Sequence, residues 1–297
     1  MGTPIRQVIS ASRRTDIPAF YMAWFMRQIR EKRFKIINPY NRRLSIFPAT
    51  PDRIHTIVFW SKNFAPFLAL DCGRQLQREG YNLFFNFTIN SEDHLLEPHV
   101  PPLDVRLRQL ARLCQHFGPE CINWRFDPIC FYHTDDHSLN DNLHDFDIIA
   151  EHASKLGIQR CITSFRDDYA KIRKRIAARS DFSFIDPSTT DKRSLILNME
   201  KRLTDLSLKL ELCCEKKFLA LLPQTSKVTG SACIPVQLLE ELFGGHLSMQ
   251  KDSGQRIADG CGCGRSKDIG SYHLHPCYHN CLFCYANPSS PPPKEMK

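Results

Sequence analysis

The chain has 297 residues, of which 42% are hydrophobic and 24% are charged, and its formal net charge is +8 at pH 7. This composition is that of an ordinary globular protein, and the length is comfortable for one large domain. The first residues contain no apolar core of an export signal, and no apolar run in the chain is long enough to cross a bilayer. We therefore expect a cytoplasmic protein with no membrane partner.

Short apolar segments rich in β-branched and aromatic residues alternate with segments of helical periodicity along most of the chain. This alternation is typical of βα units and a parallel sheet. The predicted strands are residues 7–10, 56–60, 82–90, 121–128, 159–165 and 209–215, and residues 34–38 and 44–47 are short enough to form a hairpin. The predicted helices are residues 18–32, 104–117, 142–156, 169–178, 191–206 and 235–243. Asp16 is the expected N-cap of the first helix.

The number of strand–helix units favours a complete or partial (β/α) barrel similar to a TIM barrel over an open doubly wound sheet. We expect residues 1–230 to form the barrel core and residues 231–287 to form a cysteine-rich, cluster-binding segment packed on the same domain. Residues 288–297 are polar and rich in proline, so we expect a disordered tail.

Polar residues follow one predicted strand after another, and the loops at the carboxyl ends of parallel strands converge on one functional mouth. Asn86, Thr88 and Arg125 lie inside strands and are expected to point into the barrel. The catalytic candidates are Arg13, Asp16, Lys62, Arg125, Asp127 and Arg166. The basic residues among them suit an anionic small-molecule substrate. The alternative is that strand ends are polar because chains reach the surface there, and that Arg–Asp pairs are structural ion pairs.

Three of the 13 cysteines, Cys277, Cys281 and Cys284, follow the spacing C-x-x-x-C-x-x-C. This spacing allows one short loop to wrap three thiolates around a [4Fe–4S] cluster, and it leaves the fourth iron without a cysteine from the loop. A structural zinc site uses similar cysteine pairs and is the main alternative. Disulfides are disfavoured in a chain that has no export signal.

Four further cysteines, Cys213, Cys233, Cys261 and Cys263, are enough to enclose a second [4Fe–4S] cluster or a zinc ion. Cys213 and Cys214 are expected to be adjacent on a strand, so their side chains would point to opposite faces and only one would be a ligand. Cys213 is preferred because it shares strand parity with two glutamates, Glu211 and Glu215. The possible replacement ligands are His273, His275 and His279.

Several motifs together resemble the family catalogued as domain of unknown function 1848. They are SASRRTDIP at 10–18, VFWSKN at 58–63, WRFDPI at 124–129, SFRDDY at 164–169, CCE at 213–215, and the run from CGC at 261 to CYAN at 284–287. Members of this family are similar to radical S-adenosylmethionine (radical SAM) proteins in their cysteine cluster, but they carry it at the C-terminus. The cluster loop of radical SAM proteins normally follows the first barrel strand, whereas here it follows the last. The resemblance therefore implies a barrel whose strands occur in a permuted order along the chain.

The resemblance also implies a cofactor and a reaction. S-adenosylmethionine would bind the open iron, and its reductive cleavage would start hydrogen abstraction from a substrate in the barrel mouth. A flavodoxin-like or ferredoxin-like electron donor is then needed. Phe283 and Tyr285 flank the last cysteine of the loop, and Tyr285 would lie beside the adenine. The chain lacks the Gly-Gly-Glu motif that normally holds the cofactor's amino group, and the candidates to replace it are Asn63, Asn86, Thr88 and Asp127.

Three other functions remain open at this point. The first is a cluster-dependent or electron-transfer protein that does not use S-adenosylmethionine. The second is a nucleic-acid binding or repair protein, because the chain is basic and Trp60 and Trp124 stand beside basic residues. The third is a zinc-stabilised binding protein without catalysis.

Overall fold

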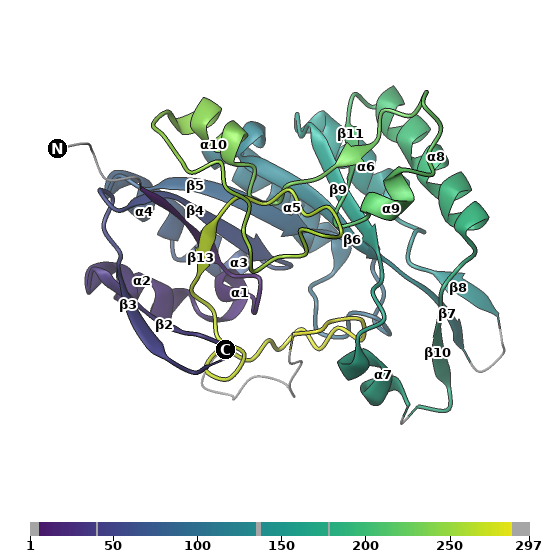
Figure 1. Cartoon of the computed structure of the whole chain (residues 1–297), viewed down its shortest axis with the longest axis horizontal. Coiled ribbons are helices and arrows are strands. Elements are labelled where there is room, and N and C mark those ends of the chain that lie inside the picture. Colours follow the sequence, from purple (N-terminus) through teal and green to yellow (C-terminus); the bar gives the residue numbers. More distant parts are fainter. Residues whose placement is uncertain (1–5, 40, 135–137, 178, 287–297) are drawn as a thin grey trace.

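An eight-stranded parallel sheet forms the centre of the structure (Figure 1), a computed structural model that describes residues 6–39, 41–134, 138–177 and 179–286. The strand order is β12-β11-β9-β6-β5-β4-β1-β13, and every neighbouring pair is parallel. The strands are β1 (Gln7–Ala11), β4 (Ile54–Ser61), β5 (Asn82–Thr88), β6 (Ile122–Ile129), β9 (Arg160–Phe165), β11 (Lys209–Leu212), β12 (Thr229–Gly230) and β13 (Ser266–Asp268). The predicted tail, residues 288–297, lies outside the described residues.

The sheet is open, so the prediction of a complete barrel is wrong. Strands β12 and β13 form its two edges, and the described residues contain no pairing between them. The six predicted parallel strands are all present, and they pair in the order in which they occur in the chain. The two edge strands contain only two and three residues. Segments this short show no alternation of polar and apolar residues, and the sequence therefore gave no sign of them.

Helices connect the strands. They are α1 (Ile17–Phe20), α2 (Met22–Arg30), α3 (Ala65–Ala69), α4 (Cys72–Arg78), α5 (Leu103–Phe117), α6 (Phe146–Lys155), α7 (Ala170–Ile176), α8 (Thr189–Asp205), α9 (Lys216–Leu219) and α10 (Val236–Phe243), with a 3-10 turn at Pro119–Cys121. The first predicted helix is present as two, α1 and α2, separated at Tyr21. Helices α3, α4 and α9 were not predicted. Within the described ranges, no helix is long and apolar enough to span a membrane.

Two small antiparallel sheets flank the large one. The predicted hairpin is confirmed as β2 (Arg33–Ile37) and β3 (Leu44–Pro48). The second sheet was not predicted and has the order β10-β7-β8. Its strands are β7 (Phe131–Thr134), β8 (Leu139–Asp141) and β10 (Phe182–Ile185). It lies beside helix α7 (Figure 1).

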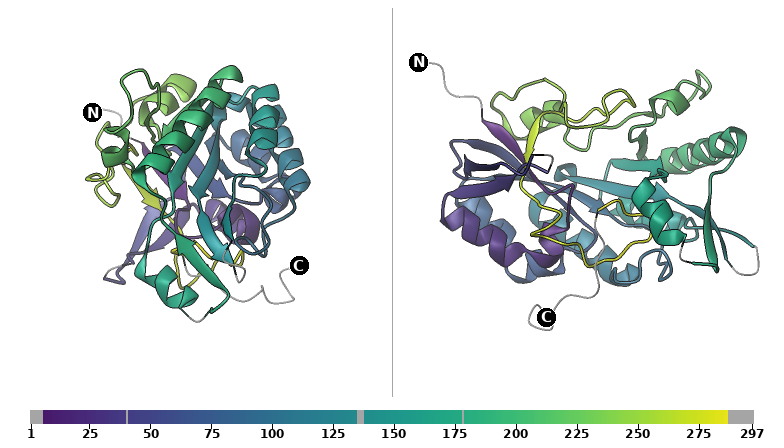
Figure 2. Two further views of the ribbon diagram at one scale, coloured as in Figure 1. Left: turned by 90° about the vertical axis from the view of Figure 1, so that its right-hand side faces the viewer. Right: turned by 60° about the horizontal axis from the view of Figure 1, so that its bottom comes forward.

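The two faces of the large sheet are covered differently. On one face the main hydrophobic core contains aromatic side chains such as Phe59, Phe85 and Phe87, packed against helices. On the other face, Ile234 and Leu239 of the C-terminal segment join Val8, Val58 and Ile162 of the sheet in a second core. Figure 2 shows the first part of this segment, in light green, on the side of the sheet opposite the N-terminal helices. The cysteine-rich segment is therefore one of the layers that bury the sheet.

Candidate functional site

The C-terminal segment reaches the carboxyl ends of the strands by way of β13, which pairs with β1. The carboxylate of Asp268, the last residue of β13, accepts hydrogen bonds from Ser12 Oγ at 2.7 Å and from the backbone N–H of Arg13 at 2.8 Å. Gly270 follows, and a Cβ at this position would lie 2.1 Å from Ser12 Oγ. Only glycine therefore allows the chain to pass so close to the loop after β1. The three-cysteine loop, residues 277–284, begins seven residues later.

The carboxylate of Asp16 fixes the three-cysteine loop to the sheet. Its Oδ1 accepts from Ser61 Oγ at 2.7 Å and from the N–H of Ala19 at 2.9 Å, so Asp16 is also the predicted N-cap. Its Oδ2 accepts from the N–H of Lys62 at 2.8 Å and lies 2.8 Å from Nε2 of His279. One buried carboxylate thus joins the ends of β1 and β4 to the middle of the three-cysteine loop.

The three cysteines of this loop lie near Lys62. Cys277, Cys281 and Cys284 each interact electrostatically with the Lys62 ammonium, and Cys281 also interacts with the other two thiols. Burial raises the pKa of all three thiols above its ordinary value. The backbone N–H of Cys284 donates to the carbonyl of Cys281 at 3.1 Å, which makes the end of the loop a tight turn. The structure therefore brings the three predicted ligands together at the carboxyl ends of β1 and β4.

Glu97 is the site residue that the sequence did not reveal. It forms a buried ion pair with Lys62, accepts from Nδ2 of Asn90 at 3.2 Å, and its Oε1 lies 4.0 Å from Cys281 Sγ. Burial would lower the pKa of Lys62, but the Glu97 carboxylate raises it. Oε2 of Glu97 is buried and has no hydrogen-bond partner among the described residues. Glu97 stands in a loop between β5 and α5 with no helical or strand periodicity, so no sequence pattern marked it.

The loop that carries Glu97 also pairs with the backbone of the three-cysteine loop. The N–H of Leu282 donates to the carbonyl of Leu96 at 2.9 Å, and the N–H of His99 donates to the carbonyl of His279 at 3.2 Å. Nδ1 of His99 is 2.9 Å from the carbonyl of Tyr278. These contacts hold Glu97 next to the cysteines by main-chain geometry.

Helix α7 secures the far end of the three-cysteine loop. The guanidinium of Arg175 donates to the carbonyls of Cys281 at 3.2 Å, Leu282 at 2.8 Å and Cys284 at 3.0 Å. The two predicted cofactor-binding aromatics lie on either side of Cys284. Phe283 is buried, with the Lys62 ammonium 5.3 Å from its ring centre. The Tyr285 hydroxyl donates to the carbonyl of Arg13 at 2.9 Å.

A second group of thiols lies against the sheet face that the C-terminal segment covers. We call it the five-cysteine group, and its members are Cys213, Cys214, Cys233, Cys261 and Cys263. Each thiol interacts with two others, in the cyclic order Cys213, Cys214, Cys261, Cys263, Cys233. The structure therefore brings the four predicted ligands of the second site together and adds one more.

The expectation that Cys213 and Cys214 point to opposite faces of a strand is wrong. Strand β11 ends at Leu212, and Cys214 has a left-handed backbone with φ of 61°. The two Sγ atoms are consequently 3.7 Å apart. Hydrogen bonding from Cys214 and Cys233 lowers the pKa of Cys213 well below its ordinary value.

Two buried arginines accompany the five-cysteine group. The Arg125 guanidinium donates to Cys233 Sγ and to the Asp127 carboxylate, which raises the pKa of Arg125 despite burial. Arg13 interacts with Cys263 and lies 3.6 Å from Asp252. Both guanidinium carbons lie 5.2 Å from the centre of the Trp60 ring. Positive charge is thus concentrated where thiolates would need it.

The other predicted cofactor-binding residues have different neighbours. Asn63 Oδ1 accepts from the N–H of Ala65 and from Gln109 Nε2, so its side chain already bonds within the protein just before helix α3. The expectation that Asn86, Thr88 and Arg125 point into a barrel is wrong, because the sheet is open. Asn86 is fully buried and instead donates to the carbonyl of Cys233, in the C-terminal segment, at 2.9 Å. Thr88 is half-buried and pairs in register with Arg125. Asp127 accepts from Arg125 and, at 2.5 Å, from Ser164 Oγ.

The histidines considered as replacement ligands have other contacts in the structure or are exposed. His275 is packed between the rings of Tyr21 and Trp24, and burial lowers its pKa to about 4. His279 bonds to Asp16, as described above. His273 is exposed. The two tryptophans that suggested nucleic-acid binding are not open stacking surfaces, because Trp124 is fully buried and Trp60 lies between two arginines.

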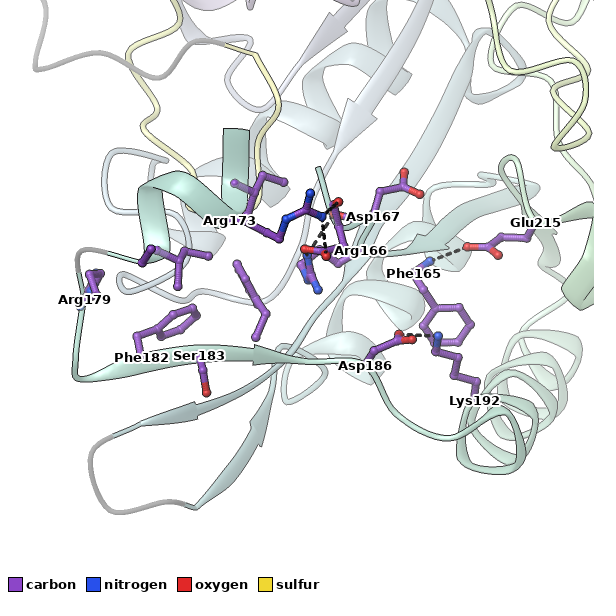
Figure 3. Close-up of a pocket in the computed structure, with 15 residues that line it drawn as sticks. Phe165, Arg166, Asp167, Arg173, Arg179, Phe182, Ser183, Asp186, Lys192 and Glu215 are labelled. Atoms are coloured by element: carbon purple, nitrogen blue, oxygen red, sulfur yellow. Dashed lines mark hydrogen bonds and ion pairs between the residues drawn. The ribbon is translucent and has the colours of Figure 1, made fainter. Parts of the chain in front are cut away.

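A cavity of about 760 Å³ opens beside the carboxyl ends of β9 and β11 (Figure 3). Its wall includes Arg166 and Glu215 from the strand ends, Arg173 from α7 and Phe184 from β10. Arg166 donates to the carbonyl of Asp167 at 3.0 Å and lies over the ring of Phe184. Burial raises the pKa of Glu215 to about 7. Acidic and basic side chains line the cavity together, so its charge alone does not select an anion.

All 13 cysteines lie within the described residues, and all have free thiols. In the same part of the chain, no three histidine, cysteine or acidic side chains converge as the ligands of a single metal ion do. No curated protein matches this chain. The family model named domain of unknown function (DUF1848) matches residues 8–286, and the chain therefore belongs to this family.

Proposed function

We propose that this protein is an iron–sulfur enzyme of the radical SAM type. In this proposal Cys277, Cys281 and Cys284 hold a [4Fe–4S] cluster, and S-adenosylmethionine binds its fourth iron. Such a cluster supplies one electron for cleavage of the cofactor. The observation that carries the proposal is the buried Glu97 carboxylate beside the three-cysteine loop. Its Oε1 lies 4.0 Å from Cys281 Sγ, and its Oε2 has no hydrogen-bond partner among the described residues.

The donor set fits such a cluster. The thiols come from a C-x-x-x-C-x-x-C loop, and cysteine thiolates are the usual ligands of a cubane cluster. Each cysteine binds a different iron, so the three sulfurs do not need to converge on one point as they do around zinc. The loop follows β13, which lies next to β1 in the sheet. That position agrees with the permuted strand order expected from the resemblance to radical SAM proteins.

The residues of the chain have supporting tasks in this proposal. Asp16 and Arg175 hold the loop, while Lys62 balances negative charge that the thiolates bring. Phe283 and its neighbours exclude water from the site. We assign the cavity beside β9 and β11 to a small-molecule substrate, because α7 lines it and also binds the three-cysteine loop through Arg175.

The five-cysteine group is proposed to hold a second cluster. Five thiols exceed the four that a cluster or a zinc ion needs, and Arg13 and Arg125 compensate the charge of thiolates in a buried place. Because Asn90 donates to Glu97 at one group and accepts from the N–H of Asp127 near the other, a continuous polar path connects the two sites.

The test uses protein purified and reconstituted without oxygen. The wild type is expected to contain iron and sulfide and, after reduction by dithionite, to convert S-adenosylmethionine into 5′-deoxyadenosine. Cys281→Ala should lose this product and the iron of the three-cysteine loop. Cys114→Ala is the matched control, since Cys114 is buried in α5 away from both groups. An unchanged iron content in Cys281→Ala would refute the ligand assignment.

A cluster-dependent protein that does not use S-adenosylmethionine is the second candidate. The missing Gly-Gly-Glu motif favours it, and the Gly244–Gly245 pair lies at the end of helix α10. Iron and sulfide without any 5′-deoxyadenosine in the wild type would support this candidate. Purified protein that contains zinc and no iron would instead indicate a zinc-stabilised binding protein without catalysis.

A further inference from the structure

The ion pair between Lys62 and Glu97 is buried beside the three-cysteine loop. The two side chains are 16% and 3% exposed. Burying a charged pair costs several kcal/mol of desolvation for each ion, so such pairs add little stability compared with apolar residues of similar volume. A pair kept at this cost, beside three cysteines at the carboxyl ends of parallel strands, suggests a role in binding.

The hydrogen bonds of the pair are incomplete. Oε1 of Glu97 accepts from Lys62 and from Asn90, whereas Oε2 is buried and has no partner. An unsatisfied buried carboxylate oxygen is costly, and a bound cation or N–H donor would remove that cost. The Lys62 ammonium has three N–H donors, of which Glu97 takes one. The pair can therefore offer an acceptor and donors to one ligand.

The position of the pair indicates the chemical class of the ligand. Glu97 Oε1 is 4.0 Å from Cys281 Sγ, and Lys62 interacts electrostatically with all three cysteines. A ligand of the open iron would thus have its iron-binding end close to both charges. An α-amino acid group carries an amino group and a carboxylate on the same carbon, and an acceptor carboxylate beside a donor ammonium is complementary to it.

We propose that Glu97 and Lys62 form a recognition site for an α-amino acid group, with Glu97 accepting from the N–H of the ligand's amino group and Lys62 donating to its carboxylate. This inference rests on the proposed function and names the residues that replace the missing Gly-Gly-Glu motif. It assigns the task to residues other than Asn63 and Asn86, whose amide groups already bond within the protein.

The experiment compares two probes on reconstituted protein. S-adenosylmethionine carries the α-amino acid group, and 5′-methylthioadenosine has the same nucleoside but lacks that group. Binding of each is measured by equilibrium dialysis, and iron content is measured on the same samples. The variants are Glu97→Gln, Lys62→Met and the double variant K62M/E97Q. The double variant leaves no unpaired buried charge, so it remains informative if either single variant does not fold.

The wild type should bind S-adenosylmethionine more tightly than 5′-methylthioadenosine. Each variant should bind S-adenosylmethionine at least about tenfold more weakly, because a charge-assisted hydrogen bond is lost. Binding of 5′-methylthioadenosine and the iron content should stay unchanged. Glu151→Gln is the matched control, because it also breaks an ion pair, the one between Glu151 of α6 and Arg202 of α8. It should behave as the wild type.

Three results would overturn the inference. Unchanged binding of S-adenosylmethionine in all three variants would make the pair structural and leave the proposed function intact. Loss of iron from Glu97→Gln but not from Lys62→Met would make Glu97 an iron ligand instead. Equal binding of the two probes by iron-loaded wild type would show that no amino acid group is recognised. A wild type that takes up no iron would refute the proposed function itself.

Discussion

At the scale of single residues, the site depends on carboxylates that join separate segments. Asp16 is the clearest example, because its two oxygens contact four groups from the start of α1, the end of β4 and the three-cysteine loop. Fixing one short side chain in this way positions a loop that is more than 250 residues away in the sequence. The carboxylate therefore links the local cap of a helix to the geometry of the proposed cluster site.

We expect Asp16→Asn to destabilise the protein by about 1–3 kcal/mol, because an amide nitrogen would face hydrogen-bond donors at a buried position. The free energy of unfolding in urea measures this effect on the protein without metal. Iron retained after reconstitution should also fall, because His279 loses its anchor next to Cys277 and Cys281. Asp104→Asn is the control, since Asp104 pairs with Arg108 on an exposed helix surface. Equal stability of both variants would contradict the role of Asp16 in joining these segments.

The sequence predicted Asp16 but not Glu97, and the difference has a physical reason. Asp16 precedes an apolar helical pattern and a proline, which together mark a helix start. Glu97 lies in an irregular loop, where its burial depends on backbone pairing with residues 279–282. Such long-range pairing leaves no local periodicity, so only the structure could place Glu97 beside the cysteines.

At the scale of secondary structure elements, the ends of strands decide which side chains meet. The predicted strand 209–215 is three residues shorter in the structure, and this change places both Cys213 and Cys214 in the five-cysteine group. Strand parity is a reliable guide only within the paired residues. It holds for Asn86 on β5, which faces the C-terminal segment, and it does not hold beyond the end of β11.

We predict that helix α7 holds the three-cysteine loop through Arg175 and not through Arg173. We expect Arg175→Lys to release iron to a chelator roughly tenfold faster than the wild type, because a single ammonium cannot bond three carbonyls as the planar guanidinium does. Amide hydrogen exchange at residues 281–286 should also be faster. Arg173→Lys is the matched control on the same helix, where the arginine pairs with Asp168 instead.

Equal rates of iron release in Arg175→Lys and Arg173→Lys would contradict a holding role for Arg175. Faster hydrogen exchange without faster iron release would mean that Arg175 orders the loop but does not limit access to the metal. The two measurements therefore separate loop order from metal retention.

At the scale of the whole molecule, the C-terminal segment connects both cysteine groups to the sheet. It covers one sheet face with Ile234 and Leu239, adds β13 at one edge, and ends at the carboxyl side of β1 and β4. The alternation of strands and helices predicted the parallel sheet. It did not show that the sheet stays open, because the edge strands β12 and β13 are too short to recognise.

Two separate groups of thiols, each with members in the C-terminal segment, predict two independent iron sites. A chain that binds a [4Fe–4S] cluster at each group should contain about eight irons. The double variant C261S/C263S should keep about four, with the three-cysteine loop still loaded and S-adenosylmethionine still bound. The double variant C277S/C284S should also keep about four, and it should not bind S-adenosylmethionine.

The five-cysteine group makes one further distinction possible. Cys214→Ser should keep the full iron content if Cys213, Cys233, Cys261 and Cys263 are the ligands, because each of these interacts with another member of the four without Cys214. Zinc at a ratio of about one per chain, retained by C277S/C284S but lost from C261S/C263S, would assign this group to a structural ion. Loss of all iron from either double variant would instead show that the two groups assemble together, which their shared polar path through Asn90 makes physically reasonable.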